Sequence, residues 1–200
     1  MSDDFGFEAL APGGYYVAIR VGFAFPEVEL NTLPRAWIHH YTQGGLMLVD
    51  PVMRWIYDNT GTSRWSDIDV PDPRGVLAHA GEYGLIHGAA VSLSGDEVHG
   101  LRTFGTFGRP DRPYTDEELG LLSTAVLSAH LAHSPPDDLT AAELEALRLV
   151  GDGLLLKEAA YRLGISEGAV KQRLRSAKAK LNARTNAQAV SKADRFGLLN

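Results

Sequence analysis

Two consecutive prolines divide this chain close to the point where its charge changes sign. The segment SPPDD spans residues 134–138, and a proline pair cannot continue a helix and draws the preceding residue out of the helical region. Residues 1–137 hold 8 basic and 18 acidic side chains, whereas residues 138–200 hold 11 basic and 7 acidic ones. We therefore expect an acidic domain over residues 1–133, a linker over 134–138 and a basic domain over 139–200.

The composition excludes several classes of protein. The 200 residues include no cysteine, which rules out a disulfide framework, a thiolate metal site and a cysteine nucleophile. No apolar run reaches the roughly 18 residues of a membrane span, and the N-terminus lacks the basic and apolar regions of a secretion signal. We expect a cytoplasmic protein without a membrane partner.

The C-terminal region has the pattern of a helix-turn-helix. Thr140 and Glu143 have the spacing of a capping box and precede an amphipathic helical run. A short second helix should stop at Gly164, and Ser166 is the expected N-cap of a third. Two short helices joined by a tight glycine turn predict a helix-turn-helix.

The third of these helices concentrates positive charge. The stretch VKQRLRSAKAKLNAR, residues 170–184, has six basic side chains and no acidic one. A helical wheel gives an apolar stripe of Val170, Leu174, Ala177 and Leu181, and opposite it Gln172, Ser176, Ala179 and Ala183. Such a run can be mere solvated surface, but the preceding turn and short helix favour a recognition helix. We expect it to bind double-stranded DNA through Lys171, Arg173, Arg175, Lys178 and Lys180.

Residues 139–199 resemble the DNA-binding domain of LuxR-type regulators. The shared motifs are Glu143, Leu147, Gly153, KEAA, GIS, AVK, KLNA and T-x-A-Q-A-V. The resemblance implies that Lys171 and Arg175 read base edges in the major groove. It also implies that a fourth helix, NAQAVSKADRF, pairs two such domains in a homodimer. Arg173 stands where many members carry histidine, which implies a different operator preference.

The acidic region mixes strand and helix patterns. The stretch YYVAIRVGFAF alternates, which predicts a strand with Val17, Ile19, Val21 and Phe23 on one face. Further patterns predict a helix over LPRAWIHHYTQGG, a hairpin turning at Ser94–Glu97, and a long helix capped by Thr115 and Glu118. We expect an α/β fold: an α/β/α sandwich around an antiparallel sheet, followed by an all-α four-helix helix-turn-helix domain.

One group of residues in this region suggests a binding site. Trp37 and Tyr41 lie four residues apart on one helix face, and Asp50 has apolar neighbours in GLMLVDPV. A buried carboxylate must accept hydrogen bonds, so either backbone amides or a ligand N–H should satisfy Asp50. Core packing for the Trp–Tyr pair and a helix cap for the aspartate before proline are the structural alternatives.

The order of Trp37, Tyr41, Asp50, Trp65 and the Gly88 of GLIHG resembles the autoinducer-binding domain of LuxR-type quorum-sensing regulators. Members bind N-acyl-homoserine lactones between sheet and helices. The resemblance implies that Trp37 donates to the lactone carbonyl and that Asp50 accepts the ligand amide N–H. It implies that Tyr41 and Trp65 line the binding site around the acyl chain and lactone ring. It also implies no cofactor.

Other positions match the pattern of this family less closely. By the same resemblance Thr103 contacts the acyl carbonyl or a 3-oxo group, whereas Leu33 stands where several members have a tyrosine that binds the acyl carbonyl. Fewer residues precede the sheet than in most relatives. These departures favour, as an alternative, a ligand-independent regulator or a short form that draws relatives into inactive heterodimers.

An enzyme is the third possibility, and the sequence does not favour it. His39 and His40 lack the spaced His/Asp cluster of a hydrolytic metal site, and there is no G-x-S-x-G motif. We predict neither catalytic residues nor a metal site.

Overall fold

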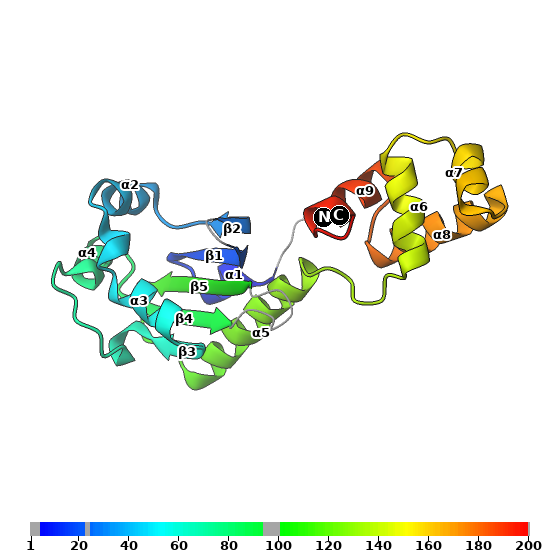
Figure 1. Ribbon diagram of the computed structural model, residues 1–200. Helices are drawn as coiled ribbons and strands as arrows, with labels where there is room; N and C mark the ends of the chain where they lie inside the picture. Colours follow the sequence, from blue (N-terminus) through cyan, green and yellow to red (C-terminus); the bar gives the residue numbers. More distant parts are fainter. Residues whose placement is uncertain (1–4, 23–24, 94–100, 200) are drawn as a thin grey trace. The chain divides into compact units, whose positions relative to one another are not determined.

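The computed structural model describes residues 5–22, 25–93 and 101–199 of the chain. The chain divides into two compact units, Met1–His133 and Ser134–Asn200. Figure 1 shows a sheet with helices in the first unit and a group of helices in the second. None of the described helices is long and apolar enough to cross a membrane.

The first unit is built on a five-stranded antiparallel sheet. Across the sheet the strands are β2 (Pro26–Asn31), β1 (Gly14–Val21), β5 (Arg102–Arg109), β4 (His87–Leu93) and β3 (Gly61–Arg64). β4 and β5 form the two arms of the predicted hairpin, with Ala90 opposite Thr106. The turn predicted at Ser94–Glu97 lies outside the described residues.

Helices cover both faces of this sheet, which confirms the predicted α/β/α sandwich (Figure 1). One face packs against α1 (Phe7–Leu10) and the long α5 (Asp116–Ala132). The other face packs against α3 (Pro51–Asp58). The remaining helical segments are α2 (Arg35–Gln43), η1 (Leu46–Leu48), η2 (Trp65–Asp67) and α4 (Val76–Glu82). α2, η1 and α4 share an apolar cluster of their own.

Alternation along the strands sends side chains into two separate cores. In β1, Val17 packs with α5, whereas the next residue, Ala18, packs with α3. In β5, Phe107 packs with α5 and Phe104 with α3. Whether a strand position is odd or even therefore decides on which side of the sheet its side chain lies.

β1 breaks this alternation near its end. Its register against β5 shifts between Ala18 and Val21, and Arg20 has a φ of 55°, which together mark a β-bulge. The prediction that Val21 shares the face of Ile19 is therefore wrong, because Val21 packs on the α3 side. Phe23, predicted on the same face, lies outside the described residues.

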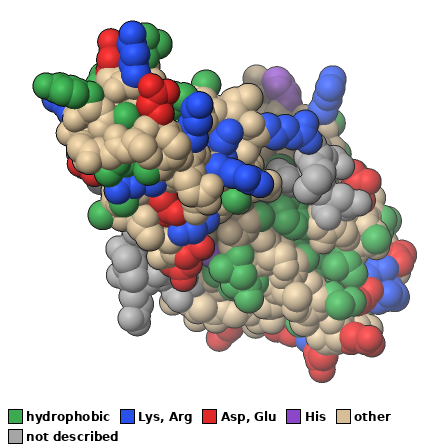
Figure 2. All heavy atoms as spheres, turned by 90° about the vertical axis from the view of Figure 1, so that its right-hand side faces the viewer, with side chains coloured by type: hydrophobic (Ala, Val, Ile, Leu, Met, Phe, Trp, Pro, Cys, Tyr) green, Lys and Arg blue, Asp and Glu red, His purple; other side chains and the backbone are tan. Residues whose placement is uncertain are grey.

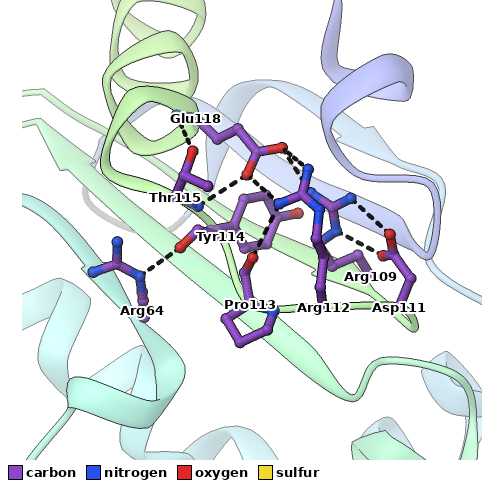
Figure 3. Close-up of polar contacts among 8 residues, drawn as sticks. All are labelled: Arg64, Arg109, Asp111, Arg112, Pro113, Tyr114, Thr115 and Glu118. Atoms are coloured by element: carbon purple, nitrogen blue, oxygen red, sulfur yellow. Dashed lines mark hydrogen bonds and ion pairs between the residues drawn. The ribbon is translucent and has the colours of Figure 1, made fainter.

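Charged side chains fasten the start of α5 to the end of β5 (Figure 3). Arg109 donates to Glu118 at 2.8 Å and to Asp111 at 2.7 and 2.9 Å. Arg112 donates twice to Glu118, at 2.8 Å, and hydrogen bonding from these arginines holds the pKa of Glu118 well below its ordinary value. Thr115 and Glu118 form the predicted capping box. This end of α5 is thus fixed against the sheet.

The described part of the second unit contains α6 (Ala141–Gly151), α7 (Leu156–Leu163), α8 (Glu167–Lys180) and α9 (Asn186–Arg195). As predicted, a capping box of Thr140 and Glu143 begins α6, and the Ser166 side chain caps α8. Gly164 ends α7 with a φ of 65°, a left-handed conformation that glycine adopts without strain. Apolar side chains from all four helices form one core, and α7 and α8 form the helix-turn-helix.

Candidate ligand cavity and DNA-binding surface

The first unit contains a cavity of about 390 Å³ on the α3 side of its sheet. Side chains of β1 and β5 line one wall, and α2, α3 and α4 contribute the others. The volume lies within the range of small-molecule sites in proteins. Among the described residues that line the cavity, Glu29 and Asp50 carry the only charges, and the rest are neutral and largely apolar.

Three of the predicted site residues meet in this cavity. Trp37 and Tyr41 project from one face of α2, with ring centroids 5.3 Å apart. The Tyr41 hydroxyl donates a hydrogen bond of 2.7 Å to Asp50 Oδ2. All three side chains line the cavity, so the spacing noted in the sequence corresponds to a real cluster.

Asp50 also has a structural role. Its Oδ1 accepts hydrogen bonds from the backbone N–H groups of Val52 at 2.8 Å and Met53 at 3.4 Å, which makes it the N-cap of α3, with Pro51 in the first turn. The helix cap that the sequence offered as an alternative is therefore present. A carboxylate has about four acceptor positions, so the capping bonds and Tyr41 leave room for a ligand N–H.

Burial changes the ionisation of this cluster. Burial raises the pKa of Asp50, and the hydrogen bonds from Tyr41, Val52 and Met53 offset only part of that rise. Burial and the neighbouring Asp50 carboxylate raise the pKa of Tyr41, and burial raises the pKa of Tyr16 to about 12. Both phenols therefore stay neutral and can donate hydrogen bonds near neutral pH.

Trp65 reaches the cavity because the residue beneath its ring is a glycine. A Cβ added to Gly88 of β4 would stand 2.0 Å from Trp65 Cδ2, far inside van der Waals contact. Trp65 lines the cavity, and its Nε1 is buried without a hydrogen-bond partner among the described residues. A buried donor without an acceptor costs free energy, so the unpaired indole N–H lowers the stability of the ligand-free protein.

Thr103 does not line the cavity. It is fully buried, and its Oγ1 accepts a 2.9 Å hydrogen bond from the backbone N–H of Arg20 and lies 2.8 Å from Nδ1 of His130 in α5. The predicted ligand contact of Thr103 is therefore wrong, because its strand position faces α5. Thr106 has the opposite parity, lines the cavity, and has a buried Oγ1 without a partner in the described structure.

Most of the apolar lining of the cavity could not be predicted from the sequence. Leu33, which departs from the tyrosine of several relatives, lines the cavity. The other apolar and aromatic lining residues include Tyr16, Val52, Met53, Tyr57 and Phe104. These positions belong to no motif, and only packing shows that they border an unfilled volume. The alternation of β5 was the one signal that could have identified Thr106.

In the second unit, α8 buries the predicted apolar stripe. Its four residues are at most 3% exposed: Val170, Leu174, Ala177 and Leu181. Lys171 and Arg175, one helical turn apart, are exposed, and Lys178 is half-buried. Arg173 lies 3.9 Å from Glu145 of α6. Figure 2 shows Lys and Arg side chains in blue and Asp and Glu side chains in red at the surface on the side that it draws.

Polar side chains on the side of α8 that faces α6 form hydrogen bonds within the second unit. Lys180 Nζ donates to Glu143 Oε2 at 2.9 Å and to the Asp138 carbonyl at 2.6 Å. Ser176, which the helical wheel places opposite the apolar stripe, donates to Glu143 at 2.5 Å, so its hydroxyl is used within the unit. Burial alone would raise the pKa of Glu143, but hydrogen bonds from Ser176, the Thr140 backbone and Lys180 outweigh it and hold the pKa at about 2.

Both units match known protein families. Residues 1–134 match the autoinducer binding domain, and residues 137–193 match the bacterial regulatory proteins of the luxR family. A solved structure of SdiA in complex with octanoyl-rac-glycerol has a TM-score of 0.49 and 24% identity, covering 99% of this chain and 87% of that one.

Curated relatives include two regulators that the chain matches over most of its length. The transcriptional activator protein SolR of Ralstonia nicotianae (strain ATCC BAA-1114 / GMI1000) is 31% identical, over 92% of this chain and 84% of that protein. The regulatory protein SdiA of Escherichia coli (strain K12) is 25% identical, over 92% and 83%. The chain therefore belongs to the LuxR family of transcriptional regulators with an autoinducer-binding domain, and it is a DNA-binding regulator of quorum sensing rather than an enzyme.

Proposed function

We propose that the cavity of the first unit binds an N-acyl-homoserine lactone. The observation that carries this proposal is the convergence of Trp37, Tyr41, Asp50 and Trp65 on one cavity. Indole N–H groups suit the carbonyl oxygens of such a ligand, and Asp50 suits its amide N–H. In this proposal Thr106, whose Oγ1 has no partner in the described part of the chain, contacts the acyl carbonyl or a 3-oxo group, and Thr103 does not.

The charge of the lining supports a neutral ligand. Glu29 and Asp50 line the cavity, and no described lining residue is Lys, Arg or His. A fatty acid or a ring-opened lactone would bring a carboxylate into an apolar site without a cation to pair with it, which costs free energy. An intact lactone carries no charge and avoids that cost.

We propose that residues 1–133 form the sensor, 134–138 the linker and 139–200 the DNA-binding domain. In this proposal α8 enters the major groove, Lys171 and Arg175 contact base edges, and Arg173 and Lys178 contact phosphates. Lys180, held by Glu143, positions α8. A homodimer paired through α9 would place two copies of α8 on half-sites about one helical turn apart.

The DNA proposal is tested through salt dependence and base preference. The affinity for double-stranded DNA should fall with salt by a log–log slope of about −0.9 for each phosphate contacted. Lys171→Ala and Arg175→Ala should weaken the preference for the operator over other sequences. An unchanged preference in Arg175→Ala would contradict the assignment of that side chain to a base.

Native mass spectrometry tests the ligand proposal. Protein produced with a mixture of N-acyl-homoserine lactones should carry one lactone per chain, and protein produced without them should carry none. The same spectra report whether the chain is a homodimer. Protein that stays free of ligand under both conditions would contradict the lactone proposal and favour a ligand-independent regulator or a partner in inactive heterodimers.

A further inference from the structure

The exposed face of α8 carries few side chains that can reach into DNA. The exposed residues of this helix are Glu167 and Gly168 in the first turn, then Lys171, Gln172, Arg175 and Ala179. Glycine and alanine extend no further than a methyl group, so they let the helix approach a surface closely. Beyond the first turn, only Lys171, Gln172 and Arg175 combine exposure with a long polar side chain.

The other polar side chains of α8 are less accessible. Four of them are half-buried: Arg173, Ser176, Lys178 and Lys180. Ser176 and Lys180 both donate to Glu143 of α6. By contrast, no hydrogen bond joins the Gln172 side-chain amide to any of the described residues. Its donor and acceptor groups are therefore available to a partner outside the chain.

Gln172 lies opposite the buried side of α8. Two residues along a helix correspond to a rotation of about 200°. Gln172 follows Val170 by two residues and precedes Leu174 by two, and these neighbours are only 0% and 3% exposed. When a recognition helix enters the major groove, the side chain opposite its buried side points deepest into the groove. Base edges form the floor of the groove and phosphates its rims, so this position favours a base contact.

The chemistry of the glutamine amide suits one base in particular. The amide offers an N–H donor and a carbonyl acceptor side by side. In the major groove adenine presents the N7 acceptor beside the N6 amino donor, and glutamine can bond to both. Arg175, three residues later, has donors only and suits the two acceptors of guanine, O6 and N7.

The spacing of these two residues fits closely placed bases. Three residues of helix rise about 4.5 Å, and successive base pairs of DNA are about 3.4 Å apart. Gln172 and Arg175 can therefore reach base pairs that are neighbours or next neighbours.

We propose that Gln172 reads an adenine in the major groove, close to a guanine that Arg175 reads. This inference rests on the proposed function, because it takes α8 to be the recognition helix. It defines the DNA partner more narrowly: each half-site contains an A·T pair within two base pairs of a G·C pair.

The test is selection of duplexes from a randomised DNA library by the full chain, with a mixture of N-acyl-homoserine lactones present, followed by sequencing. The wild type should prefer A·T at one position of each half-site by about 5- to 140-fold. Gln172→Ala should lose this preference and keep those at the other positions. Gln172→Arg should change the preference at that position to G·C, a gain that a misfolded variant cannot produce.

Tyr161→Arg is the matched control for the added charge. Tyr161 is 91% exposed and lies on α7. An arginine there adds the same charge to the same unit, so it should strengthen binding to all duplexes without changing the preference at any position.

The outcomes separate this inference from the proposed function. Base preferences that stay unchanged in both Gln172 variants would overturn the role of Gln172 and leave the recognition of DNA by α8 intact. If Gln172→Ala weakens binding to all duplexes equally, Gln172 contacts a phosphate and the inference is also overturned. If the wild type selects no sequence, the proposed recognition by α8 and this inference both fail.

Discussion

At the scale of single residues, two buried polar atoms of residues that line the cavity have no hydrogen-bond partner among the described residues: Trp65 Nε1 and Thr106 Oγ1. Burying such atoms costs about 1–3 kcal/mol each. The ligand-free protein bears that cost. In the proposed function, a ligand carbonyl that reached either atom would remove it, so these atoms would raise the affinity for the ligand.

Thr106→Val removes the unpaired hydroxyl and keeps the shape of the side chain. We expect the free energy of unfolding of the ligand-free protein to stay the same or rise, and lactone affinity to fall about tenfold. Thr103→Val is the matched change on the other face. It should lower the free energy of unfolding by about 1–3 kcal/mol, because the Arg20 N–H loses its acceptor. Urea unfolding and calorimetry measure both, and reversed behaviour of the two variants would refute the assignment.

Gly88→Ala tests whether the Trp65 ring needs a glycine at the position against which it packs. The added methyl group overlaps the indole ring, so we expect a loss of about 1–3 kcal/mol of unfolding free energy and weaker lactone binding. Gly81→Ala in α4 is the control, since a Cβ there meets no atom within 4 Å, and it should not destabilise the protein. Equal effects of the two changes would show that Gly88 has no special packing role.

At the scale of elements, the contact between α6 and α8 depends on Glu143. Its pKa is held at about 2 in the folded protein against an ordinary 4.5. A depressed folded-state pKa stabilises the protein above the unfolded value, and this contribution is lost as the pH falls through the folded value. The second unit should therefore lose stability between pH 4.5 and about 2.

Glu143→Gln should remove this pH dependence. At neutral pH we expect it to lower the free energy of unfolding by about 1.5–3 kcal/mol, and the difference from wild type should vanish as the pH approaches 2. The control is Glu145→Gln, whose exposed carboxylate lies 3.9 Å from Arg173 and should contribute little. Hydrogen exchange of α6 as a function of pH measures the effect. A constant difference at all pH values would argue against the ionised carboxylate as its cause.

Alanine substitution of lysines on the two sides of α8 should have different effects on the free energy of unfolding and on DNA binding. Lys180→Ala breaks bonds to Glu143 and Asp138, so it should lower the free energy of unfolding. Lys171→Ala should leave unfolding unchanged and weaken DNA binding. Thermal melts alongside DNA titrations distinguish the two, and two equally stable variants would disprove the structural role of Lys180.

At the scale of the whole molecule, the two units have separate cores. A lactone at a hundredfold excess over its dissociation constant should stabilise the native protein by about 2.7 kcal/mol. Because the cavity lies within the first unit, hydrogen-exchange protection should rise in β1, β5 and α3 and stay unchanged in α8. Equal protection of α8 would show that the ligand also acts on the second unit.

Features that depend on neighbours along the chain could be predicted from the amino-acid sequence. Capping boxes at Thr115 and Thr140, the glycine turn before α8 and the helical stripe around Leu174 involve residues a few positions apart. The resemblance to LuxR-type regulators rested on equally local motifs. Helix caps and helical periodicity are local because each bond or contact closes within one or two turns.

Features that depend on pairing between distant segments could not be predicted from the sequence and are visible only in the folded chain. The bulge at Arg20 and the register of β5 placed Thr106 in the cavity and Thr103 behind it. Glu143 of α6 accepts a hydrogen bond from Lys180, so the Lys180 ammonium group is held within the second unit and is not free at the surface of α8. The cavity exists because the side chains around Met53 leave volume unfilled. Unfilled volume results from the packing of many segments at once, so no single stretch of sequence encodes it.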